Sequence, residues 1–370
     1  MAQTILMTGG AGFIGRHIVA ALIARGDRVR VLDGLIDQVH RGRGRPADLH
    51  PDAELLIGDV RDESAVLKAV RGVDSVIHLA AEVGVGQSMY AVDRYTSVNE
   101  HGTAVLLQRL IDHPVRRVVT ASSMSIYGEG LYRTADGVLV DDVVRDERNS
   151  GGSWDPVDGL GRAMIPVPTP ESKRPALKSV YAIGKYVQER LTLTVAPVYG
   201  MEGTALRLWN VYGAGQALSN PYTGVLAIFA SRFANGQRPL VFEDGQQRRD
   251  FVHVDDVARA FLLALDEPGA VGQVFNIGSG EVRTIEDVAL LQARSMGCED
   301  LAPEITHRAR TGDIRHCLPD LTKARSVLGF QPRKDFAEGL AELAEWVARQ
   351  DSEDRVAQAH RELEARGLVA

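Results

Sequence analysis

"MTGGAGFIG", residues 7–15, decides the fold, because its four glycines stand between a short apolar run and an amphipathic one. The stretch satisfies GxGxxG through Gly10, Gly12 and Gly15, and GxxGxxG through Gly9, Gly12 and Gly15. Glycines at this spacing allow a tight turn and let a pyrophosphate approach the backbone N–H groups of a following helix. The stretch therefore predicts a strand, a phosphate-binding loop and a helix.

Two acidic residues lie in register with this loop. Asp33 ends the next apolar run, where a carboxylate can accept hydrogen bonds from both ribose hydroxyls of NAD. The same negative charge would repel the 2′-phosphate of NADP. Asp59, after a third run, is suited to the adenine edge. A basic loop, with Arg41, Arg43 and Arg45, could hold a 2′-phosphate, but it is more typical of a solvated surface. We therefore expect NAD as the cofactor.

Short β-branched runs alternate with helical periods, as in strand–helix–strand units of a parallel sheet. The predicted strands cover 4–9, 28–33, 53–59, 75–80, 116–123 and 204–213. The predicted helices cover 14–25, 62–71, 99–112 and 181–196. The expected fold is α/β: a Rossmann-type doubly wound parallel sheet over residues 1–205, with a smaller C-terminal α/β substrate-binding domain over 206–350.

Three segments depart from this simple division. Residues 129–179 are rich in Gly, Pro and Ser and predict a long inserted loop, either a lid or interface piece or a solvated surface excursion. Residues 248–278 are expected to return to the first domain. Residues 351–370 are charged and helix-prone, and predict a peripheral helical tail.

Composition narrows the class of protein. The net charge of −7 favours no nucleic-acid or membrane partner. Only two cysteines are present, Cys298 and Cys317, and their spacing predicts neither a disulfide framework nor a metal site. Because no apolar run approaches the ~18 residues of a membrane span and the start is unlike a signal peptide, we expect a cytoplasmic protein.

The stretch "YAIGK" places Tyr181 and Lys185 four residues apart, on one face of a predicted helix. A phenol with a pKa near ~10 is a poor base at neutral pH, but a nearby ammonium and a positive nicotinamide ring would lower that pKa. Tyr/Lys pairs are common on protein surfaces. Together with the glycine loop and the hydroxyl-rich "TASSMSIYG" at 120–128, however, this pair indicates a catalytic site.

The chain resembles the extended short-chain dehydrogenase/reductase family in the order of five motifs: "TGGAGFIG", "HLAA" at 78–81, "TASSMSIYG", "YAIGK" and "LRLWNVYG". Within that family it is similar to NAD-dependent sugar-nucleotide epimerases and dehydratases, over about residues 4–330. The resemblance implies that Ser123 hydrogen-bonds the reacting sugar oxygen. It also implies that Tyr181 is the base and that Lys185 holds the nicotinamide ribose.

The motifs and the resemblance together give a set of binding residues. Those expected at the cofactor are Gly9, Gly12, Phe13, Ile14, Gly15, Asp33, Asp59, Val60, Leu79, Ala80, Ala81, Asn99, Tyr181 and Lys185. Those expected at a nucleotide-diphosphate sugar are Ser125, Asn210, Arg249, Arg310 and Asp313. Asn99 could instead cap a helix. The resemblance also implies a homodimer through the helices near 99–112 and 181–196, whose apolar faces core packing explains equally well.

The residues after Ser123 discriminate among reactions. Relatives that dehydrate the sugar carry an Asp-Glu pair there, and those that decarboxylate carry a Glu two residues before the tyrosine. Met124 and Ser125 stand here instead, which favours an isomerase: a 4-epimerase working through a 4-keto sugar with tightly bound NAD. The alternatives are an NAD(P)-dependent 4-ketoreductase or dehydrogenase, a dehydratase or decarboxylase, and a non-catalytic dinucleotide sensor.

Two downstream stretches bear on the sugar. "QALSNPYTGVLAIFASRF" and "VFEDGQQRRDFVHV" resemble a subgroup that acts on deoxyhexose nucleotides, which makes dTDP-L-rhamnose or a related dTDP- or UDP-hexose the expected substrate. Cys317 falls where some 4-epimerases limit the C2 substituent of the sugar. A plain core cysteine explains it equally well.

Overall fold

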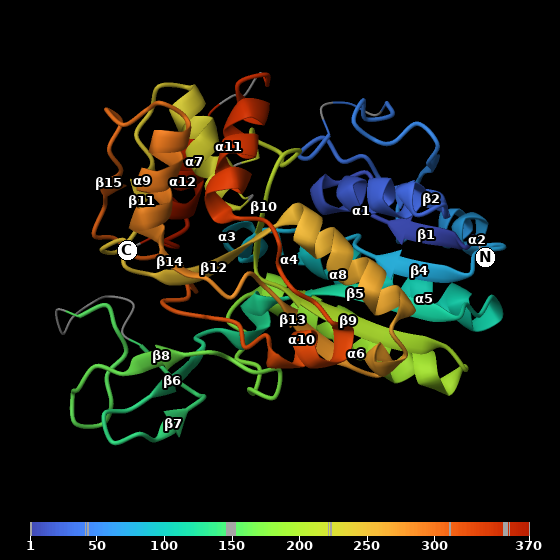
Figure 1. The fold of residues 1–370 in the computed structure, drawn as a ribbon, viewed down its shortest axis with the longest axis horizontal. Coiled ribbons are helices and arrows are strands. Elements are labelled where there is room, and N and C mark those ends of the chain that lie inside the picture. The colour runs from blue at the N-terminus through green and yellow to red at the C-terminus, as the bar shows by residue number, and fades with distance from the viewer. Residues whose placement is uncertain are drawn as a thin grey trace.

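Seven parallel strands form the central sheet of the computed structural model (Figure 1). Their order is β13 (Val274–Ile277), β9 (Glu202–Leu208), β5 (Arg117–Ser123), β4 (Ser75–His78), β1 (Thr4–Thr8), β2 (Arg28–Asp33) and β3 (Glu54–Ile57). The structure describes residues 2–40, 42, 44–145, 153–220, 222, 224–310, 312–350, 354 and 356–369. Every residue of β1, β4 and β5 is buried, as expected for parallel strands that are covered on both faces.

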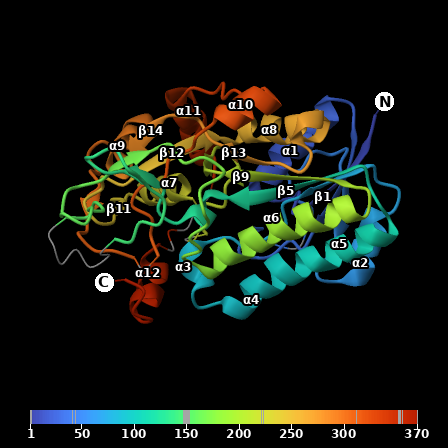
Figure 2. The same ribbon diagram turned by 90° about the horizontal axis from the view of Figure 1, so that it is seen from below.

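Helices cover both faces of this sheet, which Figure 2 shows edge-on. One face carries α1 (Phe13–Ala24), α8 (Val254–Asp266) and α10 (Thr322–Leu328). The other carries α2 (Glu63–Val70), α5 (Gly102–Asp112) and α6 (Val180–Val198), with the short helices α3 (Val85–Ser88) and α4 (Val92–Thr96) leading into α5. The predicted doubly wound α/β fold is confirmed, because alternate strand residues such as Val118 and Val119 feed separate cores on opposite faces.

The strand order reverses between β1 and β4, and ligands of such sheets bind in the crevice outside the carboxyl ends at that point. The glycine loop follows β1 directly. Gly9 adopts a φ of 70°, and a Cβ added there would lie 2.8 Å from the backbone nitrogen of Ala80, just after β4. The loop can therefore lie flat against the neighbouring strand only because this residue is glycine.

A smaller C-terminal region stands beside the carboxyl edge of the large sheet (Figure 1). Its strands are β10 (Asn210–Tyr212), β12 (Arg248–His253) and β14 (Val282–Thr284), with a second pair of β11 (Leu240–Val241) and β15 (Glu304–Ile305). Its helices are α7 (Val225–Ala234), α9 (Ile285–Ser295), α11 (Phe336–Val347) and α12 (Val356–Glu364). Phe251, Val288 and Leu340 belong to a core of its own.

The single strand predicted over 204–213 is wrong. Strand β9 ends at Leu208 in the large sheet, and β10 begins at Asn210 and pairs with β12 in the small one. Trp209, only 3% exposed, lies at the crossover. The sequence hides this break because residues typical of strands continue on both sides of Trp209 without a turn signal. In the segment 248–278, β12 likewise joins the small sheet, whereas α8 and β13 lie in the layers of the large one.

The insertion over 129–179 is not an irregular loop throughout. It contains a three-stranded antiparallel sheet of β7 (Leu139–Val140), β6 (Leu131–Arg133) and β8 (Ile165–Val167), which projects at the lower left of Figure 1. Strands of two and three residues are too short to give a periodic signal. Among the described residues, no helix is long and apolar enough to cross a membrane.

Candidate active site

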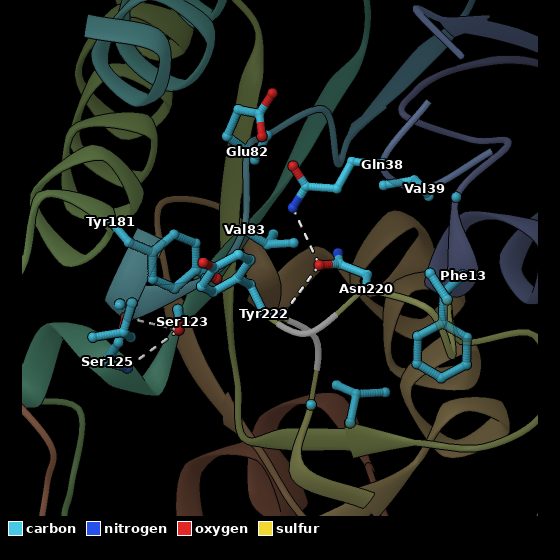
Figure 3. Close-up of a pocket in the computed structure, with 18 of the residues that line it drawn as sticks. Phe13, Gln38, Val39, Glu82, Val83, Ser123, Ser125, Tyr181, Asn220 and Tyr222 are labelled. Atoms are coloured by element: carbon cyan, nitrogen blue, oxygen red, sulfur yellow. Dashed lines mark hydrogen bonds between the residues drawn. The ribbon is translucent and has the colours of Figure 1, made fainter. Parts of the chain in front are cut away.

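A cavity of about 970 Å³ begins at the glycine loop and extends into the C-terminal region (Figure 3). It brings together every site residue predicted from the sequence except Asn99. These are Gly9, Gly12, Phe13, Ile14, Gly15, Asp33, Asp59, Val60, Leu79, Ala80, Ala81, Ser123, Ser125, Tyr181, Lys185, Asn210, Arg249, Arg310 and Asp313. Residues more than 300 positions apart in the chain therefore share one site.

The glycine-loop end of the cavity suits a pyrophosphate. Gly12 caps α1, and the first turn of that helix has neither a side-chain cap nor an acidic residue. The N–H groups there remain available to an anion, which the helix dipole also favours. A Cβ added at Gly12 would meet only the Gly9 carbonyl oxygen within 4 Å, at 3.3 Å, so the surroundings are otherwise open to a ligand.

Asp33 is fixed where a dinucleotide ribose would lie. Its carboxylate accepts hydrogen bonds from the backbone nitrogens of Ala11 at 3.0 Å and Leu35 at 2.9 Å. Each carboxylate oxygen retains a lone pair for a ribose hydroxyl. In the basic loop, Arg45 donates to backbone carbonyls such as that of Ala53 and is therefore not free to hold a 2′-phosphate of NADP. Arg41 and Arg43 lie outside the described residues. The site fits NAD.

Ser123 and Tyr181 meet at the centre of the cavity, one from the end of β5 and the other from the first turn of α6. The Ser123 hydroxyl hydrogen-bonds Tyr181 and accepts from the Ser125 hydroxyl at 2.9 Å (Figure 3). Ser122 points the other way and donates to buried Glu189 at 2.7 Å. Successive side chains of a strand point to opposite sides, so the Ser122 hydroxyl bonds a core residue whereas the Ser123 hydroxyl faces Tyr181.

The pKa of Tyr181 differs from expectation. Burial raises it above the usual value, and the hydrogen bond with Ser123 only partly opposes that shift. Lys185 does not contribute the expected lowering. Burial reduces the pKa of its own ammonium to about 7, and its Nζ donates to the Gln188 side chain at 2.7 Å. The protein's own groups therefore leave Tyr181 protonated, and lowering its pKa requires charge from the bound cofactor.

Gln188 was missed in the sequence because it belongs to no motif, although it follows Lys185 by one helical turn. Its side-chain nitrogen donates to the Ala80 carbonyl at 3.1 Å and approaches His78 Nε2 and the Thr103 hydroxyl at 3.0 Å. Burial lowers the pKa of His78 to about 3, so its ring is neutral. This network fixes the orientation of the Gln188 amide, so that its oxygen faces Lys185.

The substrate end of the cavity carries two guanidinium groups. Arg249 donates to the carbonyl oxygens of Arg315, at 2.8 Å, and of Ile314. Arg310 lies over the Phe242 ring, 4.5 Å from its centroid, and donates to Asp313 at 2.8 Å. Guanidinium groups suit a diphosphate. The ion pair with Arg310 leaves the Asp313 carboxylate less free to contact a nucleotide sugar.

Three sequence predictions need correction or completion. Asn99 neither lines the cavity nor caps a helix, because its buried side chain bonds both backbone groups of Glu82, at 2.7 and 3.1 Å. Cys317 is a core cysteine that packs with Trp209 and does not line the cavity. Glu82, which no motif indicated, is also among the residues that line the cavity (Figure 3). Burial raises its pKa, and Arg94 at 3.4 Å partly opposes this.

Asp59 lines the cavity beside Val60 but turns its carboxylate to Arg61, with contacts of 2.6 and 2.9 Å. These hydrogen bonds lower the pKa of Asp59, so the group is ionised at neutral pH.

A glycine loop on a doubly wound sheet, with serine, tyrosine and lysine at the carboxyl edge, defines a dinucleotide-dependent enzyme of the short-chain dehydrogenase/reductase type. More narrowly, the chain belongs to the NAD dependent epimerase/dehydratase family, which it matches over residues 5–143 and 161–278. Its cofactor is NAD, and its relatives act on nucleotide sugars. The gap between the two matched stretches, residues 144–160, falls inside the insertion.

Relatives of several activities cover nearly the whole chain. A dTDP-L-rhamnose 4-epimerase of Burkholderia thailandensis is 37% identical, over 94% of this chain and 96% of its own. A dTDP-glucose 4,6-dehydratase of Streptomyces niveus is 31% identical, over 92% of each. The structure of the Thermotoga maritima UDP-glucose 4-epimerase with UDP-glucose matches with a TM-score of 0.77 and 32% identity, over 94% of this chain and 99% of that one.

Proposed function

We propose that this enzyme is a nucleotide-sugar 4-epimerase, which inverts C4 of an NDP-hexose and keeps its NAD bound between turnovers. The observation that carries the proposal is the composition of the wall beside Ser123. Met124 packs into the core with Trp209, and Ser125 bonds Ser123, so neither position supplies a carboxyl group. The rhamnose 4-epimerase similarity supports dTDP-L-rhamnose, or a related dTDP- or UDP-hexose, as the substrate.

The residues divide the proton chemistry between them. Tyr181 takes the proton of the C4 hydroxyl as the C4 hydride leaves, and returns a proton when the hydride comes back to the opposite face. Ser123 bonds the same oxygen and stays within reach of the tyrosine. When bound, NAD supplies the acceptor and donor of the hydride and a positive charge beside the phenol. Oxidation and reduction cancel over one turnover, so no second substrate is consumed.

Inversion requires the 4-keto sugar to present its other face at the same site. Arg249 and Arg310 line the far end of the cavity and would hold the diphosphate through the N–H groups that their bonds to backbone carbonyls and to Asp313 leave over, while the hexose turns about its linkage. Asn210 stands between the two halves and is fixed by a bond from its amide to the Asp250 carbonyl at 2.8 Å.

Glu82 favours a second candidate, a 4,6-dehydratase, because a buried carboxyl group with a raised pKa is suited to general acid or base chemistry. Its ion pair with Arg94 favours a structural role instead. Glu82→Gln separates the two. An epimerase keeps turnover within about threefold, whereas loss of an essential acid or base costs at least ~100-fold.

The deciding experiment follows proton NMR spectra of dTDP- and UDP-sugars incubated with the purified enzyme and no added cofactor. Conversion of one sugar to its C4 epimer is expected, and Tyr181→Phe should reduce that rate by ~100- to 10⁴-fold. A 6-deoxy-4-keto product would establish the dehydratase. A requirement for NAD(P)H in proportion to product would establish a reductase.

A further inference from the structure

Helix α12, at the end of the chain, lies against the substrate end of the cavity rather than on the periphery of the molecule. Ala359, His360 and Leu363 line the cavity, and Leu368 just beyond the helix joins them. These helix positions recur at the three- and four-residue spacing of one helical face. Ala359 is 6% and Leu363 7% exposed, so this face is covered, and part of what it faces is a space shaped for a ligand.

This terminal segment contacts both sides of the cavity mouth. Toward the large-sheet domain, a Cβ added at Gly86 in α3 would lie 3.4 Å from Leu363, and the Arg366 guanidinium lies 4.3 Å from the centroid of the Tyr90 ring. Figure 2 shows α12 beside α3. Toward the C-terminal domain, the His360 ring lies 5.8 Å from that of Phe242.

Further contacts hold the segment on the C-terminal side. Arg308 pairs with Glu364 at 2.6 Å, and a backbone bridge joins Arg310 to Val369. Arg310, which is expected at the substrate, also stacks on the Phe242 ring. The same ring contacts His360 of α12. A ligand on Arg310 would therefore lie next to α12.

One carboxylate joins the two sides. The Glu362 carboxylate lies 3.2 Å from the Tyr90 hydroxyl and 3.0 Å from the Tyr222 hydroxyl, and these two hydroxyls also bond each other at 2.6 Å, so two phenol protons are shared among three contacts. Tyr90 follows α3 in the large-sheet domain. Tyr222 belongs to the segment before α7, which also reaches Gln38 through Asn220 at 3.1 Å. Three segments distant in sequence thus meet at Glu362.

We propose that α12 is a lid over the nucleotide-diphosphate end of the site, and that Glu362 latches it to Tyr90 and Tyr222. The lid completes the wall around a bound nucleoside diphosphate through Leu363 and His360, and it opens for substrate entry and product release. Since it covers the end that holds the nucleotide, it raises nucleotide affinity and keeps the nucleoside diphosphate in place while the hexose turns. The choice of ligand rests on the proposed function.

The test uses the full-length enzyme with NAD and titrates dTDP and UDP by calorimetry. Glu362→Ala removes the carboxylate that latches the lid. Tyr90→Phe removes one hydroxyl that bonds this carboxylate, and Tyr90 does not itself line the cavity. Each should weaken binding of the preferred nucleotide by about tenfold. Because both variants break one latch, the double variant should be little weaker than Glu362→Ala alone. Leu363→Ala tests the lid wall separately.

Arg361→Ala is the matched control, because Arg361 precedes Glu362 on the same helix and its side chain is exposed. It should bind nucleotide as the wild type does. If Glu362→Ala and Leu363→Ala also bind dTDP and UDP as the wild type does, α12 is not a lid. If nucleotide affinity falls but no sugar is epimerised by the wild type, the lid stands and the proposed reaction fails.

The kinetic signature adds a readout that a merely structural helix would not give. With an epimerised sugar, Glu362→Ala should raise KM by about tenfold and leave kcat within about threefold, because the latch does not touch the reacting atoms. A fall in kcat with unchanged KM would contradict a lid over the nucleotide.

Discussion

Lys185 donates a hydrogen bond from its Nζ to the side-chain oxygen of Gln188 at 2.7 Å, and this bond orients the lysine side chain. The Gln188 amide is held in turn by the Ala80 carbonyl and by neutral His78. A neutral acceptor therefore directs the lysine in a buried site, where ionisation is costly and its pKa is lowered to about 7.

Gln188→Leu should shift the pH dependence of the reaction. Burial already lowers the pKa of Lys185 to about 7, and loss of its acceptor should lower it further. The variant loses the ammonium at a lower pH than the wild type does as the pH rises. The alkaline fall in kcat should therefore move to lower pH, and kcat at pH 7 should drop about tenfold. A kcat profile from pH 5 to 9 measures both. An unchanged profile would show that the bond is dispensable.

His78 should make stability fall in mild acid. Burial lowers its pKa from the ordinary 6.5 to about 3, so between these values the unfolded chain binds a proton that the folded one does not. The free energy of unfolding should therefore decrease as pH falls below 6.5, by about 1.4 kcal/mol per pH unit for this group. His78→Gln should reduce that slope in urea unfolding between pH 5 and 8. Buried His253 and His316 contribute in both proteins, so the difference between slopes isolates His78.

Asp33→Asn should weaken the retention of NAD. Ala11 and Leu35 donate to different oxygens of the carboxylate, so replacing one oxygen by an amide nitrogen removes the acceptor of one of these N–H groups and weakens the group offered to the ribose. We expect NAD affinity to fall by at least about tenfold. The NAD released per chain on denaturation checks this, with exposed Asp52→Asn as the control. Equal retention in the two variants would refute this role for Asp33.

We expect a dimer built on α5 and α6, which pack side by side on one face of the sheet (Figure 2). Ile183 on α6 is 41% exposed although apolar, and Val198 and Tyr199 near the end of that helix are also exposed. Light scattering should give twice the chain mass of 40.2 kDa, and Ile183→Glu should give the single-chain mass. The control is Leu160→Glu, because Leu160 lies on the insertion and its side chain is 77% exposed. If only that control dissociates the dimer, the insertion forms the interface.

Local chemistry explains which parts of the fold and site could be read from the sequence. The glycine loop, the acid ending β2 and the Tyr/Lys spacing each depend on residues within one turn or one strand–helix unit, where the order of residues dictates the geometry. The strand and helix periods likewise report burial on two faces of a sheet. These signals determined the fold class, the cofactor and the family.

Tertiary structure decided what depends on residues far apart in the chain. Gln188 meets His78, and Glu82 enters the cavity, only because separate strands and helices converge at one edge of the sheet. The break between β9 and β10 is not visible in the sequence, because residues typical of strands continue across Trp209 and only the strand pairing shows that two different sheets are involved. The cover that α12 gives the site likewise follows from where the chain end packs, since its amphipathic pattern fixes a face but not what that face meets.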